Sequence, residues 1–189
     1  MKNKLGKGRV IGGKWRGTKL EIADAKGFRP TADRVRETLF NWLSTHLRGA
    51  NCLDLFAGSG ALGIEAVSRG ALSATLVECN ELLAHQIDET LERLETNKIE
   101  VVQADGLEWL SMSKLQFDIV FLDPPFDSTL VDSCLEVLSV QGLSDKALVY
   151  IECPKLLLIE LKNWTILNSS QTKEVVYMLL KKKPETIEG

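Results

Sequence analysis

Short apolar runs alternate with amphipathic stretches along the chain from residue 51 to residue 152. The runs are CLDLF (52–56), ATLVE (74–78), IEVVQ (99–103), FDIVFLD (117–123) and ALVYIE (147–152). Runs of this kind are typical of strands that are covered on both faces of a sheet. In the clearest amphipathic stretch, residues 80–96, the apolar stripe consists of Leu83, Ile87, Leu91 and Leu94. The alternation predicts an α/β fold with a Rossmann-like, mostly parallel sheet.

Different patterns flank this region. Residues 9–22 predict a small hairpin of two strands around Gly12 and Gly13, with a second break at Gly17. A helix is expected next, capped by Thr31, because an apolar residue recurs every four positions at Val35, Leu39, Leu43 and Leu47. After residue 160, WTILN and KEVVYMLL predict an antiparallel pair at one edge of the sheet. We therefore expect a hairpin extension (1–30), a main domain (31–182) and a flexible tail (183–189).

Composition fits a globular protein, with 44% hydrophobic and 26% charged residues among 189. No apolar run approaches the ~20 residues of a membrane span, and the N-terminus lacks the apolar core of a signal peptide, so we expect a cytoplasmic protein. Neither a metal site nor a disulfide framework is expected, because the cysteines are widely spaced: Cys52, Cys79, Cys134 and Cys153. His46 and His85 fall in helical stretches and are expected to be surface or packing residues.

Charge is distributed unevenly. Residues 1–50 carry 12 lysines and arginines against 4 acidic residues, whereas residues 51–189 carry 11 against 22. A basic third on an acidic body predicts a polyanionic partner at one end, such as RNA, the alternative being ordinary solvated charge. Trp15 is positioned either to stack on a base or to be a half-buried hairpin residue. The candidate RNA-binding residues are Arg9, Lys14, Trp15, Arg16, Arg29, Arg34 and Arg36, the last two being expected to face solvent or ligand.

A glycine loop follows the first strand of the alternating region. LDLFAGSGALG (53–63) contains Gly58-x-Gly60-x-x-Gly63, a pattern shared with dinucleotide-binding domains. In an open parallel sheet, ligands bind at the carboxyl ends of the strands near such a turn. The glycines allow close approach of a ligand but do not by themselves distinguish NAD from another cofactor.

Three carboxylates at successive strand ends favour a cationic cofactor. Asp54 lies four residues before Gly58, Glu78 ends the second strand and Asp105 follows the third. Carboxylates repel a pyrophosphate but attract an amino group, which favours S-adenosylmethionine over NAD. Taken alone, Glu78 is also compatible with a solvated strand end and Asp105 with a helix N-cap. The candidate cofactor-binding residues are Asp54, Phe56, Gly58, Ser59, Gly60, Glu78, Cys79, Asp105 and Gly106.

The fourth strand ends in Asp123-Pro124-Pro125-Phe126. The two prolines fix the backbone and remove two donors, so acceptors dominate this turn. The Asp123 carboxylate and the Pro124 carbonyl are suited to accept the N–H bonds of an exocyclic amine, and Phe126 is suited to stack on the base. The pattern indicates methylation of an amino group, the alternative being a turn that merely ends a strand.

Four stretches together resemble a known family. IGGKWRG, RPTADRVRETLFNWL, CLDLFAGSGALGIEA and FDIVFLDPPF, in this order and spacing, are similar to the RsmD-type 16S rRNA guanine-N2 methyltransferases of bacteria. The resemblance extends from about Arg9 to Tyr150 and more weakly through the final strands. It implies a methyltransferase domain, a hairpin that helps to bind RNA, S-adenosylmethionine as donor and a guanine of 16S rRNA, in a partly assembled 30S subunit, as acceptor.

The resemblance also implies residue roles. Asp54, Gly58 and Gly60 would bind the methionine and ribose side of the cofactor, Glu78 the ribose and Asp105 the adenine, while residues 123–126 would form the catalytic turn. We expect a monomer. The sequence leaves open an adenine-N6 or protein-glutamine methyltransferase, which would share the same turn. A more distant alternative is an NAD-binding oxidoreductase or a non-catalytic RNA-binding module.

Overall fold

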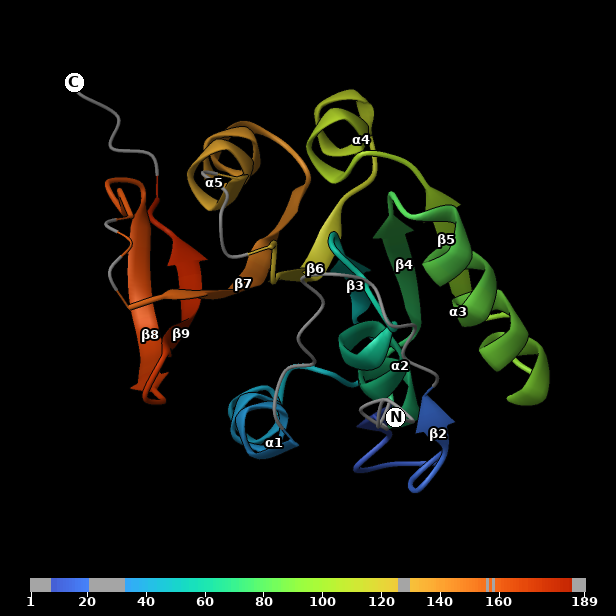
Figure 1. The fold of residues 1–189 in the computed structure, drawn as a ribbon. Coiled ribbons are helices and arrows are strands. Elements are labelled where there is room, and N and C mark those ends of the chain that lie inside the picture. The colour runs from blue at the N-terminus through green and yellow to red at the C-terminus, as the bar shows by residue number, and fades with distance from the viewer. Residues whose placement is uncertain (1–7, 21–32, 126–129, 156, 158, 185–189) are drawn as a thin grey trace, which may run out of the picture.

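A seven-stranded mixed sheet forms the centre of the protein in a computed structural model that describes residues 8–20, 33–125, 130–155, 157 and 159–184 (Figure 1). Its strands are β3 (Asn51–Asp54), β4 (Ser73–Glu78), β5 (Ile99–Gln103), β6 (Phe117–Leu122), β7 (Leu143–Pro154), β8 (Trp164–Gln171) and β9 (Val175–Lys182). Their spatial order is β5-β4-β3-β6-β7-β9-β8. The first five are parallel to one another, whereas β9 runs antiparallel to both β7 and β8. The predicted fold class and the antiparallel edge pair are confirmed.

Helices cover both faces of the sheet (Figure 1). One apolar core joins the sheet to α1 (Asp33–Trp42), α2 (Ala61–Ser68) and α3 (Glu81–Arg93). A second core, on the opposite face, joins it to α4 (Gly106–Met112) and α5 (Leu130–Val140). Covering on both faces explains why the central strands read as nearly continuous apolar runs.

The N-terminal helix is shorter than its apolar stripe. Val35, Leu39, Leu43 and Leu47 are all buried, as the four-residue spacing predicts. However, α1 ends at Trp42, and the chain continues in turns in which Leu47 N–H still donates to the Leu43 carbonyl at 3.1 Å. The predicted cap, Thr31, lies outside the described residues.

The N-terminal hairpin is also smaller than predicted. Its strands, β1 (Gly8–Arg9) and β2 (Lys19–Leu20), are two residues long each and pair antiparallel. Val10, Trp15 and Leu20 are buried in the core that α1 and α2 share. The described part of the extension therefore packs onto the main domain, while the predicted boundaries near residues 30 and 183 stay a prediction.

Cysteines 52, 134 and 153 are buried and Cys79 is exposed. Within the described part of the chain, no group of three or more histidine, cysteine or acidic side chains is arranged to hold a metal ion. Among those same residues, none of the helices combines the length and apolar character needed to cross a bilayer.

Candidate functional site

The glycine loop connects β3 to α2 at the middle of the parallel part of the sheet. Gly58 and Gly60 have φ angles of 56° and 74°, in the left-handed region that favours glycine. Gly63 serves packing instead, because a Cβ there would lie 2.5 Å from Leu76 Cδ1. Two glycines of the pattern thus shape the turn and the third brings α2 close to β4.

Asp54 is buried beneath this loop at the end of β3. Its Oδ2 accepts a hydrogen bond of 2.9 Å from the N–H of Gly63, near the start of α2. Burial raises the pKa of Asp54 to about 7, with further rises from the neighbouring charges of Asp123 and Glu78, although the Gly63 bond acts in the opposite direction. A cation placed beside this carboxyl would favour its ionised form.

Glu78 fixes the far side of the loop. One oxygen of this buried carboxylate accepts from Gly58 N–H at 2.8 Å and the other from Asn80 N–H at 2.8 Å. Each carboxylate oxygen has about two acceptor sites, so one backbone bond to each leaves capacity for a ligand hydroxyl. Cys79 lies alongside, where partial burial and then the Glu78 carboxylate raise its pKa.

Asp105 caps α4, as one sequence alternative proposed. Its Oδ1 accepts from Glu108 N–H at 2.9 Å, and the side chain is exposed. The next residue, Gly106, touches the glycine loop, because a Cβ there would lie 2.7 Å from the Leu55 carbonyl oxygen and 3.0 Å from the Phe56 ring. Asp105 therefore lies at the edge of the glycine loop, and one of its carboxylate oxygens caps α4.

The turn after β6 lies beside the glycine loop. β6 pairs with β3 so that Phe121 is opposite Asp54, and Asp123 follows two residues later at the same edge. Asp123 is partly buried, Pro124 is buried and Pro125 is exposed. The fourth member of the predicted turn, Phe126, lies outside the described residues.

Sequence reasoning missed a further acid at this edge. Leu122 of β6 pairs with Ile151 of β7, so Asp123 and Glu152 come next on neighbouring strands. Glu152 is 6% exposed and accepts a hydrogen bond of 2.9 Å from the Tyr150 hydroxyl. Burial and then the charges of Glu152 and Asp123 raise the pKa of Tyr150 well above its usual value. The signal in the sequence was the acid that ends the apolar run ALVYIE, as Glu78 ends the run ATLVE, although β7 itself continues to Pro154.

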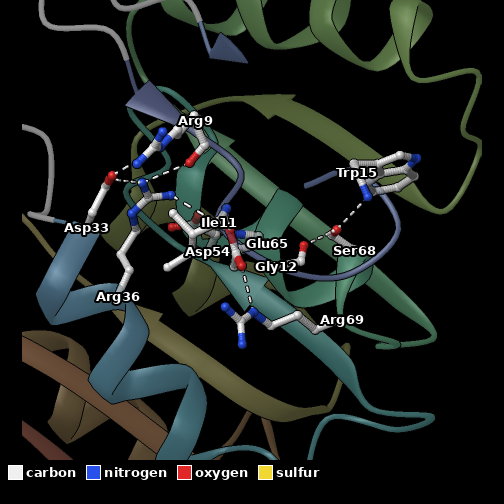
Figure 2. A network of polar contacts seen from close by, with 11 residues as sticks. Arg9, Ile11, Gly12, Trp15, Asp33, Arg36, Asp54, Glu65, Ser68 and Arg69 are labelled. Carbon is white, nitrogen blue, oxygen red and sulfur yellow. Dashed lines mark hydrogen bonds and ion pairs between the residues drawn. The ribbon is translucent and has the colours of Figure 1, made fainter. Parts of the chain in front are cut away.

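A buried ionic network, also missed from sequence, attaches the hairpin to α2 (Figure 2). Glu65 of α2, fully buried, accepts from Ile11 N–H at 2.7 Å and from Arg69 Nε at 2.6 Å. Arg36 Nη1 lies 3.9 Å from the same carboxylate, and Arg36 Nη2 donates to the Arg9 carbonyl at 2.9 Å. Hairpin, α1 and α2 are therefore joined through one carboxylate and one guanidinium.

The two adjacent glycines of the hairpin pack on the end of α2. A Cβ at Gly12 would lie 2.5 Å from the Arg69 guanidinium carbon, and one at Gly13 only 1.9 Å from the Ser68 carbonyl oxygen. Trp15 N–H donates to Ser68 Oγ at 2.9 Å. The segment IGGKW (11–15) therefore packs closely against the end of α2.

The predicted RNA-binding residues separate into two groups. Arg9, Lys14, Arg16 and Arg34 are exposed, and Arg29 lies outside the described residues. Trp15 is 9% exposed, which matches the packing alternative, with Lys14 Nζ 5.5 Å from the ring centroid. The prediction that Arg36 faces solvent or a ligand is wrong: the residue is 1% exposed, because Asp33 and Glu65 draw its guanidinium inward.

Comparison with known proteins gives consistent results. The family model "Conserved hypothetical protein 95" matches residues 8–181. Ribosomal RNA small subunit methyltransferase D of Escherichia coli strain K12 is 41% identical, over 94% of this chain and 91% of that protein. The protein of the same name from Haemophilus influenzae is 42% identical, over 94% and 95% respectively. The solved structure of the putative methyltransferase yhhF from Escherichia coli superposes with a TM-score of 0.86 at 40% identity, covering 95% of this chain and all of that one.

Proposed function

This chain belongs to the family of conserved hypothetical protein 95 and to that of ribosomal RNA small subunit methyltransferase D, and we infer its reaction from that membership. We propose that it transfers a methyl group from S-adenosylmethionine to the exocyclic N2 amine of a guanine in 16S rRNA. The observation that carries the proposal is the grouping of three carboxylates, Asp54, Glu78 and Asp123, around a glycine loop. The stretch 54–63 contains no lysine or arginine.

The residues present fit S-adenosylmethionine. When bound, this cofactor supplies a methyl group made electrophilic by its sulfonium centre. Asp54, whose pKa of about 7 reflects a buried and repelled charge, would be stabilised as the anion by the cofactor's cationic amino group. Glu78 has remaining acceptor capacity for ribose hydroxyls, and the free oxygen of Asp105 is suited to the adenine amine. The same carboxylates would repel the pyrophosphate of NAD.

The turn after β6 would hold the acceptor. An exocyclic amine is a weak nucleophile because its lone pair is delocalised into the base. Asp123 and the Pro124 carbonyl would accept its two N–H bonds, which favours a pyramidal nitrogen with its lone pair directed at the methyl group. Phe121 of β6 pairs with Asp54 of β3 and Asp123 follows two residues later, so the proposed acceptor and cofactor residues are at the same edge of neighbouring strands.

The hairpin would orient the RNA. Arg9, Lys14 and Arg16 are exposed on a segment that Glu65 and Ser68 fix to α2, and α2 itself begins at the glycine loop. Cations held in this way can bind phosphates in a defined position relative to the cofactor. We propose further that the enzyme acts as a cytoplasmic monomer on an assembling 30S subunit.

The test is transfer of tritium from labelled S-adenosylmethionine to 30S subunits purified from a strain that lacks this gene, with nucleoside analysis of the digested rRNA. Label in N2-methylguanosine is expected. Label in N6-methyladenosine, or in protein glutamine, would replace the proposal with one of the two relatives that share the turn. Absence of transfer while the cofactor still binds would overturn the rRNA assignment.

A further inference from the structure

The proposed reaction leaves one buried acid at the acceptor edge without a role. Glu152 lies near the end of β7, in the register position next to Asp123 on β6. It is 6% exposed, although a carboxylate without a role would be expected to turn toward water. Its burial therefore suggests that Glu152 has a function in the proposed acceptor site.

Strand register places this acid on the same face of the sheet as the rest of the site. Asp54 is opposite Phe121, and Phe121 is opposite Tyr150. Side chains two residues apart on a strand point to the same face, so Asp123 and Glu152 share the face of Asp54. Three acids thus stand at one edge of the parallel region: Asp54 at the end of β3, Asp123 just after β6, and Glu152 just after the last residue of β7 that pairs with β6.

Tyr150 holds Glu152 in place from the same strand. The Tyr150 hydroxyl donates to Glu152 Oε2 at 2.9 Å, and its ring is buried edge-on against Phe121 at a centroid distance of 6.4 Å. On the other side, β9 places Tyr177 opposite Glu152. A rigid aromatic surround of this kind limits the rotamers open to the carboxylate, which is what selective recognition requires.

The bases differ in what they offer to two carboxylates. On its Watson–Crick edge guanine presents two neighbouring donors, the N2 amine and N1–H, whereas adenine presents the N6 amine beside N1, an acceptor. An ionised carboxylate only accepts hydrogen bonds. Two carboxylates side by side therefore complement guanine, while one of them would oppose the N1 lone pair of adenine.

We propose that Glu152 is the specificity-determining residue of the acceptor site: it accepts the N1–H of the target guanine while Asp123 accepts from the N2 amine, and Tyr150 is the positioning residue that orients Glu152. This assignment rests on the proposed function, since it requires guanine as the acceptor. It explains how an enzyme whose catalytic turn is shared with adenine methyltransferases can select guanine, through a residue on the neighbouring strand.

The test compares guanine with 2-aminopurine at the target position of 30S subunits reconstituted from ligated 16S rRNA. 2-Aminopurine keeps the N2 amine but has an acceptor at N1. In single-turnover methyl transfer the unmodified enzyme should prefer guanine by at least about 100-fold, because a site built to bind a donor rejects the analogue that lacks it. The E152Q variant offers an amide N–H to the N1 acceptor, so its preference should fall to within about tenfold.

Controls separate recognition from folding. E152Q should bind S-adenosylmethionine with unchanged affinity, and E160Q, which alters an exposed glutamate paired with Lys162, should keep the full preference. If E152Q does not fold, Y150F provides a second variant, with an expected loss of preference of about tenfold. Equal use of both bases by the unmodified enzyme, or an unchanged preference in E152Q, would overturn the role of Glu152. Failure to methylate guanine at all would instead refute the proposed function.

Discussion

Asp54 illustrates how one residue links the stability of the protein to its ligand. Its pKa in the folded chain, about 7, lies above the ordinary value of about 4, so the folded state holds a proton more tightly than the unfolded chain. Stability from this group is therefore complete below about pH 4 and is lost as the pH rises through 7. The variant Asp54→Asn keeps an acceptor for Gly63 N–H and removes this loss. The melting temperature of Asp54→Asn minus that of the unmodified protein should therefore increase as the pH is raised from 5 to 8.

Each kcal/mol corresponds to about 2–4 °C for a domain of this size, so a rise of several degrees is expected by differential scanning calorimetry without ligand. The control is Asp145→Asn, an exposed position at the start of β7. S-Adenosylmethionine should bind Asp54→Asn at least about tenfold more weakly, because the anionic partner of its amino group is gone. If the melting temperatures of Asp54→Asn and the unmodified protein changed with pH in the same way, the raised pKa of Asp54 would be contradicted.

Asp123 allows a sharper separation of binding from chemistry. We expect Asp123→Ala to reduce the methyl-transfer rate by at least about 1,000-fold, because the acceptor amine loses its charged hydrogen-bond partner in the transition state. Cofactor affinity should change little, since the proposed mechanism assigns Asp123 to the acceptor and not to the cofactor. Single-turnover kinetics and calorimetric titration measure the two quantities separately. Unchanged turnover would remove Asp123 from the mechanism.

The α2 helix connects the proposed cofactor-binding loop with the N-terminal hairpin that is proposed to bind RNA. Its first turn is bound by Asp54 and its later residues by the hairpin, through Glu65 and Ser68. Glu65→Gln would remove the anion that Arg69 Nε binds at 2.6 Å and would leave the buried Arg36 guanidinium with Asp33 but without the Glu65 charge. Breaking a buried ionic contact of this type costs about 3–5 kcal/mol. We expect urea unfolding to show this loss and the KM for 30S subunits to rise more than the KM for S-adenosylmethionine.

A matched change at an exposed position of α1, Glu37→Gln, should leave the free energy of unfolding and both KM values unaltered. The double variant Glu65→Gln/Arg36→Met should lose less than the two single variants together, because the buried Arg36 cation is then removed along with the Glu65 anion that it faces. Additive losses would show that Glu65 and Arg36 do not act as a pair.

The elements differ in how far sequence could predict them. The strands were predicted because burial on both faces produces apolar runs that a local pattern reveals. Arg36 was misplaced because a local pattern assigns every arginine to solvent. Asp33 is close to it in sequence, but its other partners, the Arg9 carbonyl and Glu65, lie 27 and 29 positions away and become neighbours only through folding. Glu152 was missed for a related reason, since the register that aligns it with Asp123 is a property of two paired strands.

Across the whole molecule, charge should determine how RNA approaches. The described residues of the N-terminal third expose Arg9, Lys14, Arg16 and Arg34, while the remainder of the chain is strongly acidic. An acidic body repels RNA, so phosphates should contact the hairpin side and bring the substrate to the edge where Asp123 lies. Electrostatic contacts of this kind release counterions, which makes affinity fall with salt.

The combined variant Arg9→Ala/Arg16→Ala/Arg34→Ala tests this orientation. If each arginine neutralises a phosphate, the slope of log affinity against log salt should become shallower by about 2–3, with weaker binding at low salt. The matched control, Lys114→Ala/Lys146→Ala/Lys181→Ala, removes three exposed cations from the acidic body and changes net charge by the same amount. Its slope should stay unchanged if position, and not total charge, governs binding. Equal changes in both variants would mean that RNA approaches without a preferred face, which would leave the fixed hairpin without a role in docking.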